Sequence, residues 1–270
     1  MSACKQGVRD VNYGLSIKHD TMKKIVIIGA SSGMGLKIAS DFARMGWRVG
    51  MAARHTATMD ELKKQYPSNT AVARIDVTEP DAGKQLYNLI ELIDGMDVLL
   101  YCAGCGWNNP ELDEERDMQT LHTNVVGFTR IANAAYKYFR DTANVTPGQI
   151  AVITSIAGTK GIGVSATYSA SKRYQSTYLQ ALDQLAHQQH VNVRITEIRP
   201  GFVDTPLLDT ATRKYPMTMS VDYVAPRIER AILKQKRRVT VDSRWAIVTG
   251  LWRLIPDCLW RHIALDTPTR

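Results

Sequence analysis

Short runs of β-branched and other apolar residues alternate with helical patterns from Lys23 to Val241, and this alternation constrains the fold more than any other feature. It is typical of a parallel sheet in which a helix forms each crossover. The first run is apolar throughout after Lys24, as expected of a strand that helices cover on both faces. The expected strands are Lys24–Ile28, Arg48–Ala52, Val72–Ile75, Val98–Tyr101, Gln149–Thr154, Asn192–Ile198 and Arg238–Val241.

The segments between these runs carry apolar residues at helical spacing. We therefore expect an α/β fold: a single Rossmann-type, doubly wound parallel sheet of about seven strands with helices on both faces, followed by a C-terminal helical tail. At 270 residues, such a fold can still form one domain. The expected helices are Gly35–Met45, Met59–Gln65, Asp81–Ile93, Leu112–Arg140, Thr167–Gln188 and Val221–Lys234.

A glycine-rich turn, Gly29–Gly35, follows the first strand and opens the next helix. Glycines let a backbone pass close to a pyrophosphate, and the free amides at a helix N-terminus hold negative charge. In this context the turn predicts a dinucleotide site, whereas the glycines alone would also fit a tight turn without a ligand. The expected contacts are Gly29, Ser31, Ser32, Gly33, Met34 and Gly35.

Arg54 follows the second strand, where dinucleotide sites distinguish a free ribose 2′-hydroxyl from a 2′-phosphate. Because a guanidinium can hold a phosphate through several donors, Arg54 favours NADP(H) over NAD(H), although a solvated surface arginine is the alternative. Asp76 ends the third strand and is a candidate to bind the adenine amino group, with Val77 beside it. Asp76 would equally suit a cap on the turn before Pro80.

Three polar residues after the fifth strand form a candidate catalytic group. Ser155 ends that strand, and Tyr168 begins the following helix, with Lys172 four positions later. This spacing places the last two side chains on one helix face. An ammonium group stabilises a phenolate, so we expect Lys172 to lower the pKa of Tyr168 and make it an acid/base catalyst. Ser155 would donate a hydrogen bond to a carbonyl, while the alternative for Tyr168 and Lys172 is a surface pair.

In combination, these motifs resemble those of the short-chain dehydrogenase/reductase family, from about Lys23 to Val241. The family's TGxxxGxG is similar to Gly29–Gly35, with Ile28 in place of the leading threonine, and its YxxxK is similar to Tyr168–Lys172. The resemblance implies that Asn124 is the helix-borne catalytic asparagine, which would position a water that relays protons. The implied catalytic residues are Asn124, Ser155, Tyr168 and Lys172.

The resemblance also implies cofactor contacts in later loops, with Val203 and Thr205 at the nicotinamide carboxamide and Lys172 at the nicotinamide ribose. One departure is Cys102, where the family has an asparagine that hydrogen-bonds the central sheet, a role that a thiol fills only weakly. We expect this departure to retune the site locally without loss of activity. The further implied contacts are Ala103, Gly104, Tyr168, Lys172, Pro200, Gly201, Val203 and Thr205.

The implied activity is an NADP(H)-dependent oxidoreductase that interconverts a ketone and a secondary alcohol on a lipophilic or otherwise apolar small molecule. Hydride would reach the carbonyl carbon while Tyr168 protonates the oxygen. The alternative is a non-catalytic NADP-binding regulatory or redox-sensing protein of the same fold. No metal is expected, because the six histidines show no metal-ligand spacing. A redox role for Cys102 and Cys105 is not expected, because they lack a thioredoxin-like setting.

Three loops at the carboxyl edge of the sheet, 105–111, 156–167 and 206–219, should bound the substrate. They are mildly apolar, and simple packing is the alternative explanation for their apolar side chains. The candidates to line a pocket are Trp107, Ile162, Val164, Leu207, Leu208 and Met217.

The chain is expected to divide into an N-terminal extension at 1–21, a dinucleotide-binding catalytic domain at 22–242 and an amphipathic helical tail at 243–270. The tail holds three of the five tryptophans beside arginines and aliphatic residues, and Pro256 should begin its second helix. Such a tail suits a membrane surface, which would make membrane tethering a third possible function. It equally suits packing on the sheet edge or on a second subunit.

Charge and cysteine content limit the partners and the compartment. The formal charge is +8, and the tail from Lys234 carries eight basic and three acidic residues. Because no nucleic-acid-binding motif accompanies this surplus, we expect no nucleic-acid partner. Four cysteines are too few for a secreted disulfide framework, and residues 1–21 lack an apolar signal region. We therefore expect a cytoplasmic homodimer or homotetramer, with peripheral contact at the inner membrane surface as one use of the tail.

Overall fold

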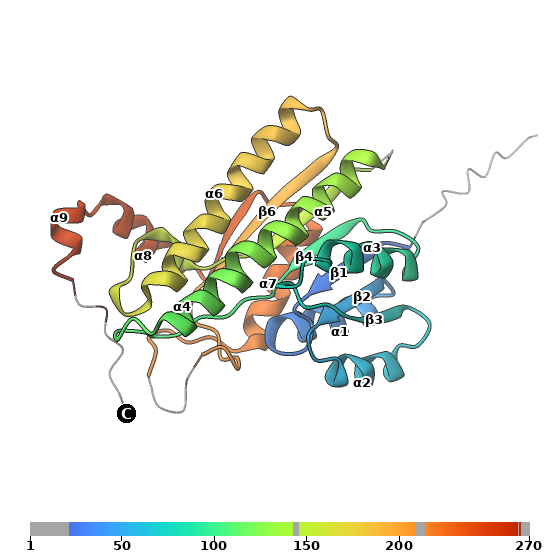
Figure 1. Ribbon diagram of the computed structural model, residues 1–270, viewed down its shortest axis with the longest axis horizontal. Helices are drawn as coiled ribbons and strands as arrows, with labels where there is room; N and C mark the ends of the chain where they lie inside the picture. Colours follow the sequence, from blue (N-terminus) through green and yellow to red (C-terminus); the bar gives the residue numbers. More distant parts are fainter. Residues whose placement is uncertain (1–21, 143–145, 209–213, 264, 266–270) are drawn as a thin grey trace, which may run out of the picture.

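The computed structural model describes residues 22–142, 146–208, 214–263 and 265. Seven parallel strands in these segments form one sheet with the order β3-β2-β1-β4-β5-β6-β7 (Figure 1). This confirms the expected doubly wound α/β fold. The strands are β1 Lys24–Ile28, β2 Arg48–Ala53, β3 Thr70–Arg74, β4 Val98–Tyr101, β5 Gly148–Ile153, β6 Val193–Pro200 and β7 Arg238–Val241.

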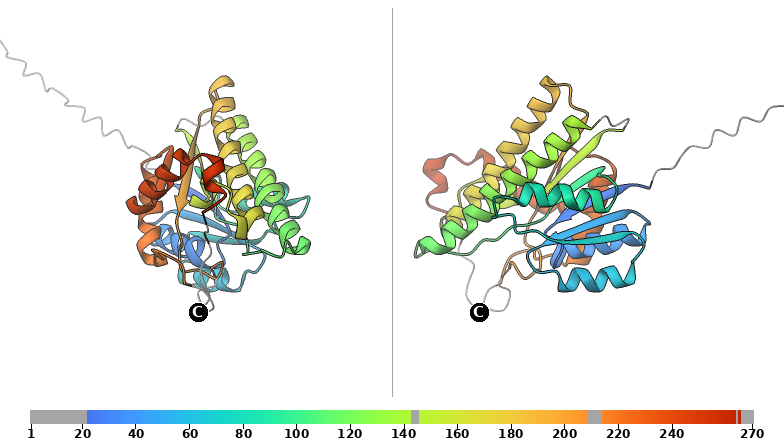
Figure 2. Two further views of the ribbon diagram at one scale, coloured as in Figure 1. Left: turned by 90° about the vertical axis from the view of Figure 1, so that its left-hand side faces the viewer. Right: turned by 45° about the vertical axis from the view of Figure 1, so that its right-hand side comes forward.

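Helices cover both faces of the sheet, and α5 and α6 run beside each other on one of them (Figures 1 and 2). One face packs on α3, α5 and α6 through side chains such as Leu86, Phe128 and Leu179. The other packs on α1, α2, α7 and α8 through side chains such as Phe42 and Ile228. The helices are α1 Gly33–Arg44, α2 Ala57–Gln65, α3 Ala82–Leu92, α4 Glu114–Leu121, α5 Phe128–Asp141, α6 Ala166–Gln188, α7 Val221–Leu233, α8 Ser243–Leu254 and α9 Asp257–Trp260.

The strand order reverses at β1, which pairs with β2 on one side and with β4 on the other. Gly29 N still bonds the Ala52 carbonyl at 2.7 Å, and Cys102 N bonds the Ile28 carbonyl at 2.8 Å. Beyond these two bonds the chains after β1 and β4 lead to different helices. A crevice at the carboxyl end of the sheet results, in the position where open α/β sheets bind ligands.

In place of the expected long helix Leu112–Arg140, the structure has a helical stretch from Glu114 to Asp141 that is not one regular α-helix. A π-helical segment, His122–Gly127, lies between α4 and α5. Such a segment inserts an extra residue per turn and is frequent at functional sites, but apolar periodicity does not reveal it. The third strand also begins earlier than expected, at Thr70, because Thr70 is in register with Val49 of β2.

The tail forms two helices, α8 and α9, at the end of the molecule that lies away from α1–α3 (Figures 1 and 2). A series of neighbouring rings fixes it: Trp245 lies 5.5 Å from Phe202 and 6.4 Å from Trp252, which lies 5.4 Å from Trp260. One face of the tail therefore packs on its own chain. Among the described helices, none combines the length and apolarity that crossing a bilayer requires. The expected extension at 1–21 lies outside the described residues.

Candidate active site

A crevice of about 240 Å³ opens where the strand order reverses. It gathers side chains and backbone from the turns after β1, β2, β3 and β4, and from the segment after β6. Most of the expected cofactor contacts lie here. Those that line the crevice are Gly29, Ser31, Ser32, Gly33, Met34, Gly35, Arg54, Asp76, Val77, Ala103, Gly104 and Thr205.

The turn after β1 leaves no room for side chains at Gly29 and Gly35. Gly29 has a φ of 89°, and a Cβ there would lie 2.5 Å from the Ala103 backbone nitrogen. A Cβ on Gly35 would lie 2.1 Å from the Gly29 carbonyl oxygen. Helix α1 begins inside this turn, and its N-cap, Ser32, makes no capping hydrogen bond through its side chain. The first amides of α1 are therefore available to an anion, and the turn fits a pyrophosphate.

Arg54 and Asp76 lie on the crevice wall beyond the glycine turn. The Arg54 side chain is exposed, as a reader of a bound phosphate must be. The Asp76 Oδ1 atom accepts hydrogen bonds from Thr78 N at 3.0 Å and from Thr78 Oγ1 at 2.8 Å. Burial raises the pKa of Asp76, but these bonds and the charges of Arg54 and Arg74 outweigh it and lower the pKa. Asp76 thus caps its turn, as one of the two interpretations expected, and it also faces the crevice.

Ser155 and Tyr168 come together at the start of α6. Ser155 lies just beyond β5, and its hydroxyl accepts a hydrogen bond from Ala157 N at 3.1 Å. Burial raises the pKa of Tyr168, and the side chain of Ser155 lowers it but only partly opposes this effect. The expected net lowering of this pKa by Lys172 is therefore wrong for the protein alone: burial dominates, although the Lys172 ammonium lies over the phenol ring, 5.8 Å from the centroid.

Lys172 is only 4% exposed although it carries an ionisable amine. Its Nζ atom donates to the Ile153 carbonyl at 3.3 Å and to Gln175 Oε1 at 3.1 Å. Burial lowers the pKa of Lys172 to about 8, while the Cys105 and Cys102 thiols act in the opposite direction. An amine with this pKa changes its charge near neutral pH, which is a property of functional sites.

Gly104 lies between the crevice and the catalytic cluster, by which we mean Asn124, Ser155, Tyr168 and Lys172. It lines the crevice, and a Cβ there would lie 3.3 Å from Asn124 Oδ1 and 3.4 Å from Lys172 Nζ. Because Gly104 has no side chain, only its backbone separates Lys172 from the end of the crevice. The expected catalytic residues therefore lie together, deeper than the glycine turn.

Asn124 lies fully buried in the π-helical segment. Its Nδ2 atom donates to the Cys105 carbonyl at 2.7 Å and to Ser171 Oγ at 3.0 Å, and its Oδ1 atom accepts from Cys105 N at 3.0 Å. Its backbone carbonyl accepts from Gln175 Nε2 at 2.9 Å. Because the Gln175 oxygen accepts from Lys172, this amide bridges Asn124 and Lys172 directly. The resemblance had implied a water held by Asn124.

Gln175 is a site residue that the sequence reasoning missed. It is fully buried, three positions after Lys172 and seven after Tyr168 in α6. Residues at these spacings share one helix face. A polar side chain on the face of the Tyr–Lys pair is thus the signal that would have identified it.

Five of the expected cofactor contacts are not among the described residues that line the crevice: Tyr168 and Lys172, described above, and Pro200, Gly201 and Val203. Pro200 pairs with Val241 of β7 and is buried. A Cβ on Gly201 would lie 2.2 Å from Trp245 Nε1, so this glycine makes room for the tail. Val203 is buried in the core. Pro200, Gly201 and Val203 therefore do not line the crevice as the structure describes it, and their contact with the cofactor stays a prediction.

The first two expected substrate loops are tied together across the mouth of the site. Asn109 N bonds the Val164 carbonyl at 2.8 Å, and Ser165 Oγ bonds Asn108 Oδ1 at 2.7 Å. A Cβ on Gly106 would lie 2.1 Å from the Tyr168 ring, so the first loop packs directly on the candidate acid. These two loops therefore bound the catalytic cluster.

The expected apolar lining is divided between several places. Leu207 lines the cofactor crevice, Ile162 lines a separate cavity, and Met217 packs on the core. Trp107, Val164 and Leu208 are partly buried in their loops. These six residues therefore do not form a single pocket.

Two further features bear on the chemistry. Burial raises the pKa of the Cys102 and Cys105 thiols, and both are free. Thiols in this state are poor nucleophiles. In the described part of the chain, no group of three or more His, Cys, Asp or Glu side chains is arranged to hold a metal ion.

Comparison with known proteins places these features in a family. The family model described as short chain dehydrogenase matches residues 23–216. An uncharacterized oxidoreductase of Myxococcus xanthus is 28% identical over 243 residues, which cover 87% of this chain and 93% of that protein. The uncharacterized oxidoreductase Rv0945 of Mycobacterium tuberculosis is 29% identical over 255 residues, which cover 90% of this chain and 98% of that protein.

Solved structures share the fold at low sequence identity. A short chain dehydrogenase/reductase from Burkholderia phymatum in complex with NAD superposes with a TM-score of 0.77 at 16% identity, over 91% of this chain and 97% of that one. ElxO with NADP bound superposes with a TM-score of 0.72 at 20% identity, over 84% of this chain and 99% of that one.

Proposed function

This chain belongs to the short-chain dehydrogenase/reductase family of nucleotide-dependent oxidoreductases, and we propose that it interconverts a ketone and a secondary alcohol with NADP(H). The observation that carries the proposal is the meeting of Ser155, Tyr168 and Lys172 at the inner end of the glycine-lined crevice. A phenol beside a serine hydroxyl, with a buried amine over its ring, forms an acid/base group that can act on an oxygen atom.

The crevice supplies what a dinucleotide needs. The amides at the start of α1 would bind the pyrophosphate, Asp76 and Val77 would contact the adenine, and Arg54 would bind a ribose 2′-phosphate. Gly104 and Thr205 would border the nicotinamide end. When bound, the cofactor supplies or accepts the hydride.

The residues of the catalytic cluster would then transfer one proton to or from the substrate and stabilise the substrate oxygen. In the reductive direction, Tyr168 gives its hydroxyl proton to the carbonyl oxygen, and Ser155 donates a hydrogen bond to the same oxygen. Lys172, held by Gln175, places a positive charge near the phenolate that remains. The reverse direction takes the proton from an alcohol. The loops that close over Tyr168 would limit the entry of water.

Hydride turnover against a panel of apolar ketones tests the proposal. The wild type should consume NADPH with at least one member of the panel, and Tyr168→Phe should reduce kcat by about 100-fold or more because it removes the proton donor. The variant should still bind NADPH. Cofactor binding without turnover of any ketone or alcohol would instead favour the non-catalytic, redox-sensing alternative.

Cofactor preference tests the role of Arg54 separately. We expect Arg54→Asp to move the ratio of kcat/KM for NADPH to that for NADH toward NADH by about 100-fold, because a carboxylate accepts from a free 2′-hydroxyl and repels a phosphate. Arg74→Asp removes a nearby exposed arginine and is the matched control. An unchanged ratio in Arg54→Asp would show that this side chain does not read the phosphate.

We propose that residues 243–263 also serve as a surface for anionic membranes, next to a catalytic unit at 22–242. Ile247, Leu251 and Leu254 lie on one face of α8 and are 67%, 58% and 78% exposed. Arginines beside such an apolar stripe favour negatively charged lipid. Vesicles of phosphatidylglycerol should sediment the full chain, and Leu251→Ser with Leu254→Ser should abolish this. Equal sedimentation of both proteins would contradict the assignment.

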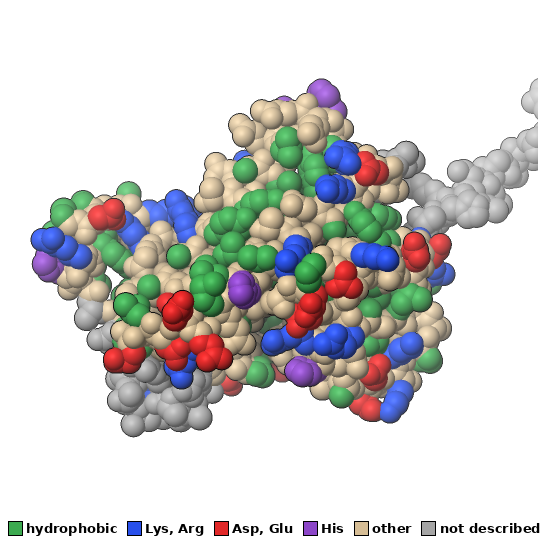
Figure 3. Space-filling view, viewed as in Figure 1, with side chains coloured by type: hydrophobic (Ala, Val, Ile, Leu, Met, Phe, Trp, Pro, Cys, Tyr) green, Lys and Arg blue, Asp and Glu red, His purple; other side chains and the backbone are tan. Residues whose placement is uncertain are grey.

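We also propose that the chain forms a homodimer or homotetramer through the face built by α4, α5 and α6. Hydrophobic side chains gather along this face in Figure 3. Met118 of α4, Val126 of the π-helical segment between α4 and α5, and Tyr174 of α6 are exposed. Such a patch on a soluble domain is often an interface. Light scattering should give a multiple of the chain mass, and Val126→Glu with Tyr174→Glu should reduce it. A monomeric wild type would exclude this assembly.

A further inference from the structure

A second cavity, of about 910 Å³, lies between α6, the strands β6 and β7, and the tail helix α8. It shares no lining residue with the cofactor crevice. Helix α6 separates the two sites: Tyr168 and Lys172 belong to its catalytic side, whereas Ser169, Arg173 and Ser176 face the cavity. The proposed oxidoreductase activity makes no use of this space.

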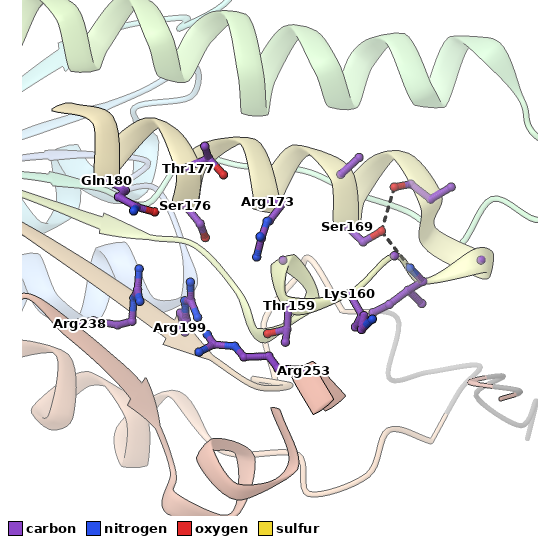
Figure 4. A pocket seen from close by; sticks show the side chains of 16 residues that line it. Thr159, Lys160, Ser169, Arg173, Ser176, Thr177, Gln180, Arg199, Arg238 and Arg253 are labelled. Carbon is purple, nitrogen blue, oxygen red and sulfur yellow. Dashed lines mark hydrogen bonds between the residues drawn. The ribbon is translucent and has the colours of Figure 1, made fainter. Parts of the chain in front are cut away.

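Cationic side chains from five segments of the chain line this cavity. Arg173 extends from α6 across the space toward Arg199, and Arg253 reaches from α8 toward the same guanidinium (Figure 4). Arg238 of β7 and Lys160 of the loop after β5 complete the group. No aspartate or glutamate is among the described residues that line the cavity.

The charges around the cavity do not balance. Glu197 pairs with both Arg199, at 2.7 Å, and Arg238, at 2.6 Å, and Asp257 pairs with Lys160 at 2.6 Å. Five cations are thus matched by two carboxylates. Neither Arg173 nor Arg253 has an ion pair with a carboxylate in the segments that the structure describes.

The buried centre of the group is Arg199, which is 5% exposed. Its Nε atom is committed to Glu197, and within the described residues no hydrogen bond from its two terminal nitrogens to another protein group is present. Burial lowers the pKa of Arg199 and Glu197 raises it, while Arg238 and Arg253 lower it further. The effects of Arg238 and Arg253 indicate that their guanidinium groups lie close enough to Arg199 to repel it.

One more polar group in this wall lacks a partner. The Thr159 hydroxyl is buried and has no hydrogen bond to any described group, although the residue is part of the cavity lining. Burying a hydroxyl without a partner costs free energy. A cavity with surplus positive charge, free guanidinium donors and an unpaired hydroxyl therefore has the donors that an anion requires.

We infer that this cavity is a binding site for a phosphate-bearing anion, separate from the cofactor crevice, with Arg173, Arg199 and Arg253 as its principal contacts. Guanidiniums bind phosphate oxygens through paired donors, and a surplus of three positive charges suits a group that carries two or more negative ones. The volume lies within the range of organic ligand sites and exceeds the needs of a single inorganic ion.

Two sources of this chemistry fit the position. A free phosphate ester could occupy the cavity alone. A phospholipid headgroup could occupy it with its chains along α8, since Arg253 lines the cavity and the next residue, Leu254, is 78% exposed. Both ligands carry the phosphate group that the arginines would bind, and sedimentation with vesicles distinguishes between them.

Titration calorimetry with inorganic pyrophosphate tests the site in the full chain at low salt. The wild type should show a binding event that weakens as salt increases. Arg173→Gln with Arg253→Gln should weaken it by about tenfold or more, because two charge-assisted contacts are removed. Both side chains are exposed and lack carboxylate partners, so the fold should tolerate the change. Arg194→Gln with Arg261→Gln removes the same charge elsewhere and should bind as the wild type does.

Titration in the presence of saturating NADPH separates this event from pyrophosphate binding at the glycine turn, which the dinucleotide would occupy, and the event should persist there. The inference is overturned if the wild type gives no such event, if both double variants lose it equally, or if NADPH abolishes it. These results are independent of ketone turnover, so failure of the proposed activity would leave them unaffected.

Vesicles identify the source once that event is found. Sedimentation with phosphatidylglycerol vesicles that pyrophosphate reverses, and that Arg173→Gln with Arg253→Gln prevents, supports a lipid headgroup. Pyrophosphate binding without such sedimentation supports a free phosphate ester.

Discussion

At the scale of single residues, the Gln175 amide determines how the buried amine of the active site is held. It accepts from Lys172 and donates to the Asn124 carbonyl, so it fixes two groups from different helical segments. An acceptor beside an ammonium favours its charged form, against the burial that lowers the pKa of Lys172 to about 8. Gln175 thus acts as a positioning residue for the acid/base pair.

We therefore expect Gln175→Leu to lower the pKa of Lys172 further and to move the alkaline limb of the pH profile of kcat to lower pH, by about one unit. Gln175→Glu should move it to higher pH, because a carboxylate stabilises the ammonium. The measurement is kcat between pH 6 and pH 10 for a good ketone substrate.

Gln184→Leu, on an exposed position of the same helix, is the control and should keep the wild-type profile. A purely structural role for Gln175 would reduce stability but leave the position of the limb unchanged, and such a result would refute the positioning role.

The sequence identified most individual site residues but not the way they interact. The Tyr–Lys spacing and the glycine turn are local, and both are placed as expected. The Arg199 cluster was missed because its members come from segments far apart in the chain that meet only in the fold. The spacing of Gln175 to Lys172 is local, but its bond to the Asn124 carbonyl is not. The direction of the Tyr168 pKa was also wrong, since spacing conveys proximity but not burial.

At the scale of elements, the C-terminal helices are attached to the loop that follows β5. Trp260 Nε1 donates to the Gly161 carbonyl at 2.7 Å, and the Lys160 ammonium lies 5.9 Å from the centre of the Trp260 ring. Lys160 also pairs with Asp257. Helix α9 has only four residues, so these contacts, not its own hydrogen bonds, must hold it.

Trp260→Ala should therefore release α9 without unfolding the domain. We expect amide hydrogen exchange at 257–263 to accelerate by about tenfold, in line with the loss of about 1–2 kcal/mol for one hydrogen bond and one cation–π contact, while β5 keeps its protection. Leu259→Ala, which removes a side chain that is 59% exposed, should have little effect. Equal exchange in all three proteins would show that Trp260 does not hold the helix.

Element boundaries show where sequence patterns lose information. Strands β1, β4 and β7 were predicted to the residue because a polar or turn residue flanks each apolar run. Strand β3 begins at Thr70 because β2 offers it a partner there. The π-helical segment holds Asn124 fully buried between two α-helices, and hydrophobic periodicity did not disclose it.

At the scale of the whole molecule, one buried carboxyl makes the stability of the fold depend on pH. Glu229 of α7 is 6% exposed and lies near Asp41 of α1, which pairs with Lys37 and Arg44. Burial, together with the Asp41 carboxylate, raises the pKa of Glu229 to about 7 from its ordinary 4.5. Between these two values the folded protein binds a proton that the unfolded chain has lost.

The contribution of protonated Glu229 to the free energy of unfolding is therefore fully present below about pH 4.5, and it is lost as the pH rises through about 7. We expect Glu229→Gln to be more stable than the wild type at pH 8, by about 2 kcal/mol, and close to it at pH 5. Urea unfolding at both values measures the difference. Glu91→Gln, at an exposed position of α3, should show none. A difference of the same size at both pH values would mean that Glu229 is charged throughout.

The strand order also has a consequence for biosynthesis. One wall of the nucleotide crevice follows β1, and the facing wall, at Ala103, follows β4, after the chain has crossed back from the outer edge of the sheet. A ribosome releases these walls at different times, so a nascent polypeptide that ends with β3 has half a binding site. Nucleotide can assist maturation of this enzyme only after the fourth strand has emerged.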